Sequence, residues 1–145
     1  MTKTYTSLVT AFAAVAALAT AAPVQAQEVY LVARVPFDFA VGAANLPHDT
    51  YRLSRLNGKP EMLFLRGERT GSFVRTSEER LPRDGGTPML VFHRYGDQYF
   101  LRQVRWDGAA RLDLPETKME RAAAESRGDR AASVMETVTI LAERQ

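Results

Sequence analysis

Residues 89–106 read MLVFHRYGDQYFLRQVRW and contain two runs rich in β-branched and aromatic residues on either side of Gly96-Asp97. A glycine followed by a short polar residue is typical of a two-residue hairpin turn, because the first central position of a type I′ or II′ turn has a positive φ. A hairpin alone is only marginally stable in water. The segment therefore predicts two antiparallel strands that the rest of the chain must cover.

A two-residue turn at Gly96-Asp97 also predicts which residues of the two strands lie opposite each other. In each opposed pair the two residue numbers add up to 193. Apolar side chains fall on both faces of this pairing, whereas a hairpin with one solvated face alternates more strictly. We therefore expect central strands that are covered on both sides. The expected pairs are Tyr95 with Gln98, His93 with Phe100, Phe92 with Leu101, Val91 with Arg102, Leu90 with Gln103 and Met89 with Val104.

Residues 1–26 have the features of a secretory signal peptide. Lys3 gives the N-terminal region a positive charge, and the 15 residues from 8 to 22 are almost all apolar. Small residues before Gln27 predict cleavage between Ala26 and Gln27. An uncleaved membrane anchor is the alternative, but a membrane-spanning helix needs about 20 apolar residues. We expect export to the periplasm or outside the cell, with no membrane-spanning segment after cleavage.

Residues 27–145 are enough for one β-rich domain with its own core. Removal of Lys3 leaves 18 basic and 17 acidic side chains, so no basic surplus is available for a nucleic-acid partner. Arginines outnumber lysines 16 to 3, which reflects either anion recognition or genomic base composition. The absence of cysteine excludes thiol chemistry, cysteine-bound metals and lipid attachment at a cysteine.

Turn-forming residues divide this domain into about seven short strands. Residues 42–50 and 78–88 are rich in polar residues, Gly and Pro and are expected to be loops. Asn57-Gly58 and Asp107-Gly108 are expected to be turns. The β-branched residues of 133–142 favour a closing strand over a helix. The expected strands outside the first hairpin are 29–41 with a break at Pro36, 51–56, 62–66, 72–76, 111–114 as strand or loop, and 133–142.

One helix is expected late in the chain, at roughly 115–127. Thr117 and Glu120 have the spacing of a capping box, and Gly128 is placed to end the helix. Its apolar content is low, which predicts a largely solvated surface helix. Together these patterns predict a mainly β fold, a small antiparallel sandwich or barrel of about seven strands with one late surface helix.

No catalytic motif is present. His48 lies in a polar loop, whereas His93 lies in mid-strand and is a general base, a metal ligand or a packed strand residue. Asp38 and Asp97 are better explained as a strand-surface and a turn residue than as an acid–base pair. Because nucleophile, nucleotide and metal motifs are absent, no cofactor or metal is expected, and a non-catalytic protein is favoured over an enzyme.

The part of the hairpin from His93 to Trp106 carries the densest group of polar and aromatic side chains. Aromatic rings beside arginines stack sugars, bases or peptide rings. The alternative is a set of ordinary cross-strand Arg–Tyr pairs. The candidate binding residues are His93, Arg94, Tyr95, Tyr99, Arg102 and Trp106.

Two motifs resemble those of a group of small exported bacterial proteins of uncharacterised function. VPFDFAVGAANLPHDTYRL at 35–53 is similar to their VPFDF-x-VG…LP-x-G-x-Y motif, and LVFHRYGDQYFLRQV at 90–104 to their LVFHRYGD-x-YFL motif. Asp49 replaces the expected Gly of the first motif, and Asp tolerates a left-handed backbone better than most residues. The resemblance implies an exported β-rich domain and no activity.

The sequence therefore favours an exported, non-catalytic structural or interaction module with an envelope protein or a polysaccharide as partner. The alternative is a small-ligand-binding or enzymatic β-barrel with a pocket near His93. A hydrated hollow that holds His93 beside Arg94 or Asp38 favours the alternative, and a filled core favours the first interpretation.

Overall fold

The computed structural model describes residues 29–57, 59–83, 85–126 and 135–145. The predicted signal peptide with its predicted cleavage site, and Gly128, lie outside them. The described residues form twelve strands and one helix, which confirms a mainly β chain with one late helix. The elements are β1 (Tyr30–Val35), β2 (Phe39–Val41), β3 (Ala44–Leu46), β4 (Asp49–Leu56), β5 (Lys59–Arg66), β6 (Gly71–Arg75), β7 (Ser77–Arg80), β8 (Met89–Tyr95), β9 (Gln98–Asp107), β10 (Ala110–Asp113), α1 (Lys118–Glu125), β11 (Glu136–Leu141) and β12 (Glu143–Arg144).

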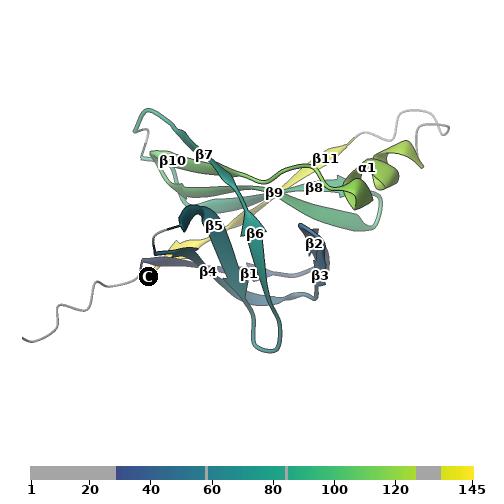
Figure 1. The fold of residues 1–145 in the computed structure, drawn as a ribbon, viewed down its shortest axis with the longest axis horizontal. Helices are drawn as coiled ribbons and strands as arrows, with labels where there is room; N and C mark the ends of the chain where they lie inside the picture. Colours follow the sequence, from purple (N-terminus) through teal and green to yellow (C-terminus); the bar gives the residue numbers. More distant parts are fainter. Residues whose placement is uncertain (1–28, 58, 84, 127–134) are drawn as a thin grey trace, which may run out of the picture.

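The strands form two sheets that pack against each other (Figure 1). One sheet has the strand order β12-β1-β4-β5-β6, and the other has β11-β8-β9-β10-β7 with β2 beside β9 and β3 beside β2. Every pair is antiparallel except β2 with β9. The sheets do not close into a barrel. The sequence predicted either a sandwich or a barrel, and the structure has the two separate sheets of a sandwich.

The core lies between the sheets because alternate residues of each strand point inward. Leu53 and Leu65 of the five-stranded sheet are fully buried, as are Leu90 and Phe92 of the other sheet. They belong to one cluster of apolar side chains. Since the chain has no cysteine, burial of this apolar surface is the main stabilising contribution to the fold.

Within the described residues the chain crosses between the sheets four times, between β1 and β2, β3 and β4, β6 and β7, and β11 and β12. The last two crossings join strands at the edges of both sheets. Thr76 joins β6 to β7, is buried, and donates its backbone N–H to Glu61 O at 2.7 Å. Ala142 joins β11 to β12, is also buried, and donates its N–H to Pro88 O at 2.9 Å. These bends satisfy the backbone donors that a change of sheet would otherwise leave unpaired.

The β8–β9 hairpin follows the expected register only near its turn. Gly96 has a φ of 63°, and the expected pairing holds from Tyr95–Gln98 back to Phe92–Leu101. The three pairs expected beyond it are wrong, because an irregularity between Val91 and Phe92 places Val91 opposite Gln103. The extra residue on β9 is a β-bulge, which lets Leu101 and Val104 both point into the core.

Two segments that the sequence predicted as loops contain short strands. Residues 42–50 include β3 and the first residues of β4, and residues 78–88 include most of β7. All four residues of β7 are exposed, so this edge strand has no apolar face from which a sequence pattern could predict it. Such short elements explain why more strands are present than the seven or so expected.

Other expected elements are confirmed. The break at Pro36 separates β1 from β2, and the uncertain segment 111–114 lies mostly in β10. β11 confirms the closing strand expected within 133–142, of which residues 133 and 134 lie outside the described part.

The helix α1 is shorter at both ends than the expected 115–127. Thr117 is its N-cap and accepts the backbone N–H of Glu120 at 3.1 Å. Two of its residues, Glu120 and Ala123, are buried, so the helix is docked on the sheet and not only solvated. Figure 1 shows α1 beside the hairpin end of β8 and β9 and close to β2.

Candidate functional site

A buried carboxylate lies where α1 meets the seven-stranded sheet. Glu120 is only 1% exposed. Its Oε1 is 3.1 Å from Nδ1 of His93 and 3.4 Å from the hydroxyl of Tyr95, and its Oε2 accepts a bond from Nη1 of Arg102 at 3.0 Å. Because an ionised carboxylate only accepts hydrogen bonds, Nδ1 of His93 is the donor. We call these four residues the Glu120 cluster.

The local structure explains why these groups converge. The N-cap at Thr117 sets the first helical turn, from which Glu120 points to the sheet instead of back to the cap as in a reciprocal capping box. The β-bulge in β9 lies next to Arg102, and bulges commonly redirect a side chain. Burial, and next the negative charge of Glu120, raise the pKa of Tyr95.

The six residues predicted as a binding surface do not form one surface. Three of them, His93, Tyr95 and Arg102, meet at Glu120. Because their polar groups bind the same protein carboxylate, the Glu120 cluster is a structural contact between α1 and the sheet.

The other three predicted residues lie elsewhere. Arg94 donates to Gly96 O and to Glu136, and its guanidinium lies 5.4 Å from the ring centre of Tyr99. Tyr99 stacks on Phe37 with ring centres 3.8 Å apart. Trp106 is buried in the core. Arg94 and Tyr99 are thus an ordinary cross-strand pair.

A pocket of about 620 Å³ lies beside α1 and is lined by both Asp38 and Asp97. His93 is not among its lining residues. His48 is exposed, and its Nδ1 lies 2.9 Å from Oδ1 of Asp38. The hydrogen bond from the His48 side chain, followed by that from its backbone N–H, lowers the pKa of Asp38. The hollow near the hairpin therefore does not bring His93 and Asp38 together.

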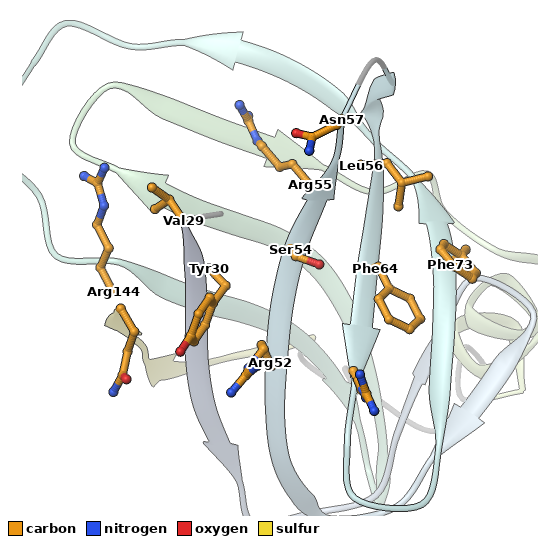
Figure 2. A pocket seen from close by; sticks show the side chains of 12 residues that line it. Val29, Tyr30, Arg52, Ser54, Arg55, Leu56, Asn57, Phe64, Phe73 and Arg144 are labelled. Atoms are coloured by element: carbon orange, nitrogen blue, oxygen red, sulfur yellow. The ribbon is translucent and has the colours of Figure 1, made fainter. Parts of the chain in front are cut away.

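A larger pocket, of about 1010 Å³, lies on the outer face of the five-stranded sheet (Figure 2). We call it the outer groove. It collects residues from β1, β4, β5, β6 and the C-terminal end of the chain. Its lining residues are Val29, Tyr30, Arg52, Ser54, Arg55, Leu56, Asn57, Phe64, Arg66, Phe73, Arg144 and Gln145.

One row of the outer groove is aromatic. Tyr30 faces Ser54, Ser54 faces Phe64 and Phe64 faces Phe73 across four neighbouring strands. Figure 2 shows these four side chains in this order on one face of the sheet. The rings of Phe64 and Phe73 stack with centres 4.3 Å apart, and Phe73 is 58% exposed. An exposed stacked pair of this kind offers apolar surface to a ligand.

The neighbouring row carries two arginines that face each other. Arg52 on β4 is directly opposite Arg66 on β5. The guanidinium of Arg52 also lies 4.2 Å from the ring centre of Tyr30. Like charges that face each other across two strands destabilise a sheet. The outer groove therefore concentrates positive charge.

Three of the four arginines that line the outer groove have no carboxylate partner among the described residues, as is also the case for Arg34 and Arg75 outside the groove. The three are Arg52, Arg66 and Arg144. Four other arginines, including one at the end of the groove, have carboxylates nearby. These pairs are Arg55 with Glu78, Arg94 with Glu136, Arg102 with Glu120, and Arg111 with Glu79 and Asp113.

The sequence does not predict the outer groove, because the register of β4 and β5 departs from the one that a simple turn implies. A simple two-residue turn at Asn57-Gly58 would place Arg52 opposite Leu63, whereas an irregularity next to Leu56 places it opposite Arg66. Pro60 lies in this irregular segment and has no backbone N–H to donate. The excess of arginine over lysine was the one signal available, and it does not indicate where the arginines meet.

No family model, curated protein or solved structure matches the chain. In the part of the chain that the structure describes, no helix is long and apolar enough to span a membrane. Nor do the described residues include three or more His, Cys, Asp or Glu side chains grouped to hold a metal ion. The Glu120 cluster and the outer groove are therefore the features of the molecule that bear on its function.

Proposed function

We propose that this protein is an exported, non-catalytic interaction module that binds an anionic ligand in the outer groove. The observation that carries the proposal is the pair Arg52 and Arg66, which face each other without a described carboxylate partner. The features of residues 1–26 support export, to the periplasm or the outside of the cell.

An anion bound between the two arginines would remove the cost of opposing like charges. A guanidinium presents its N–H groups as a planar fork that matches carboxylate and phosphate oxygens. Arg144 adds a third positive charge to the wall of the groove. Charge complementarity therefore favours an anionic ligand over a neutral or cationic one.

The position of His93 supports a non-catalytic function. A general base must reach a substrate proton, either directly or through one water. The Nδ1 atom of His93 lies 3.1 Å from Glu120, which leaves Nε2 as the ring nitrogen that could act as a base, and His93 lines neither the pocket beside α1 nor the outer groove, where a substrate could bind. The alternative of an enzyme or ligand pocket near His93 has less support, because His93 does not line the pocket beside α1.

Titration calorimetry with two anionic probes, polyglutamate and oligogalacturonate, tests the proposal. The double variant Arg52→Gln/Arg66→Gln should lower the affinity for at least one probe about tenfold or more, because each hydrogen bond to a charged group contributes about 1.5–3 kcal/mol. The control Arg34→Gln/Arg75→Gln removes the same charge from exposed arginines of this sheet outside the groove. Equal losses in both variants, or no binding of either probe, would contradict the proposal.

A further inference from the structure

The two rows of the outer groove place specific demands on a ligand. Arg52 and Arg66 lie two residues along their strands from Ser54 and Phe64. Two residues advance a strand by roughly 6.8 Å. A ligand that uses both rows must therefore carry anionic groups beside flat, partly apolar faces. We infer that the ligand is an acidic polysaccharide, a chain of sugar rings with carboxylates attached; this inference rests on the proposed function.

Sugar rings match the aromatic row. The C–H face of a sugar ring is apolar, and burying it against an aromatic ring removes that surface from water. Phe73 offers such a surface, since it is 58% exposed and stacked on Phe64. At the other end of the row, Tyr30 is stacked by Arg52 and keeps a polar hydroxyl for hydrogen bonds to sugar hydroxyls.

Acidic sugars also match the arginine row. In a uronic acid the carboxylate is attached directly to the ring, so the charge lies beside the ring face that stacks. An acidic peptide carries its carboxylates on flexible side chains without such a face, and ordering them on binding costs entropy. A free phosphate would bind the arginines and leave the aromatic row unused.

The extent of the groove favours a chain of several sugars. Its lining runs from Arg144 on β12 to Phe73 on β6. This distance covers four interstrand spacings, or roughly 19 Å. Its volume of about 1010 Å³ lies at the upper limit of about 1,000 Å³ for small-molecule pockets. A single sugar would fill only a part of it.

The experiment compares the purified protein's affinity for four probes. They are an oligogalacturonate hexamer, its methyl ester with the carboxylates masked, polyglutamate of equal charge, and vesicles of phosphatidylcholine with phosphatidylglycerol. We expect the hexamer to bind about tenfold more tightly than polyglutamate, because one aromatic contact contributes up to about 1.5 kcal/mol beyond area burial. It should also bind more tightly than the ester, which lacks the carboxylates that the arginines bind. The galacturonate dimer should bind more weakly than the hexamer.

The variant Phe73→Ala separates stacking from charge. It should remove the preference for the hexamer over polyglutamate and leave the affinity for polyglutamate unchanged. Leu141→Ala is the matched control, since Leu141 is 67% exposed on the other sheet and should change neither affinity.

The outcomes distinguish the two proposals. Equal, groove-dependent binding of the hexamer and polyglutamate overturns the polysaccharide and leaves the anion-binding function in place. Stronger binding to the vesicles overturns it in favour of a lipid surface. No groove-dependent binding to any anionic probe overturns both.

Discussion

At the scale of single residues, Glu120 holds a helix that has little apolar surface of its own. Ala123 is the other buried residue of α1, and its burial contributes less than that of a large side chain. A buried carboxylate is costly unless it is paired, and here His93 and Arg102 provide the partners. The cluster therefore determines where α1 docks.

Glu120→Gln should destabilise the protein by about 2 kcal/mol. Breaking a buried ion pair costs about 3–5 kcal/mol, and the side chains of His93 and Arg102 are about a quarter exposed, which reduces this cost. Urea unfolding of both proteins measures the difference. Glu125→Gln changes an exposed carboxylate on the same helix and should have little effect. A loss as small as that of the control would show that the ion pairs do not hold the helix.

Asp49, which replaces the Gly expected from the resemblance, binds two backbone donors. Its carboxylate accepts the N–H of Glu68 at 2.8 Å and that of Thr50 at 2.7 Å. The Glu68 bond, and then the Thr50 bond, lower the pKa of Asp49 in the folded protein. The ionised form thus stabilises the fold above the unfolded pKa of about 3.9, and this contribution is lost as the pH falls through the lower folded pKa.

The variant Asp49→Ala should therefore have a stability that depends less on pH below about 5 than that of the parent protein. The measurement is the urea midpoint at several pH values between about 6 and 2.5. Asp97→Ala, which removes an exposed turn carboxylate, serves as the control. Parallel pH profiles for the parent and Asp49→Ala would contradict the prediction.

At the scale of elements, two irregular pairings determine where side chains meet. The bulge in β9 keeps Leu101 and Val104 in the core and accompanies the turn of Arg102 toward α1. The irregular start of the β4–β5 pairing brings Arg52 opposite Arg66. Each site therefore depends on a break in regular sheet geometry.

The short helix α1 also depends on its cap. Thr117→Ala should cost about 1 kcal/mol, because it removes the acceptor of the Glu120 N–H. Hydrogen exchange should show faster exchange of the Glu120 amide. Thr117→Ser keeps a hydroxyl acceptor and should restore most of the protection. If Thr117→Ala and the parent exchange this amide at the same rate, the cap does not stabilise the first turn.

At the scale of the whole molecule, each of the two sheets carries a different one of the two sites. The seven-stranded sheet carries α1 and the Glu120 cluster, while the five-stranded sheet presents the outer groove on its outer face. The bends at Thr76 and Ala142 are two of the four connections between the sheets. A rigid core between them holds the strands of the groove in register, so that a ligand need not order them on binding.

Export of the whole protein remains a prediction from residues 1–26. Expressed with its full N-terminus in a bacterium, the protein should be recovered outside the cytoplasm with Gln27 as its first residue, as measured by mass spectrometry. Ala26→Arg should block this cleavage, because a signal peptidase requires a small residue there. The neighbouring change Gln25→Asn is the control. Recovery of the uncleaved chain from the cytoplasm would contradict the prediction.

Short-range patterns in the sequence determined much of the fold. Alternating apolar residues predicted most strands, Gly96-Asp97 predicted the hairpin turn, and Thr117 predicted the start of the helix. These features depend on residues close together in the chain, whose backbone preferences and side-chain spacing act locally. The sequence also predicted the mainly β class, because that class follows from the number and spacing of such segments.

Only the tertiary structure decided where distant side chains meet. His93 and Glu120 are 27 residues apart, and Arg52 faces Arg66 only because of an irregular pairing. A shift of one residue in register moves a whole strand's side chains to the other face, so no local pattern predicts such contacts. The packing of the complete core selects the register, and the register places the Glu120 cluster and the outer groove.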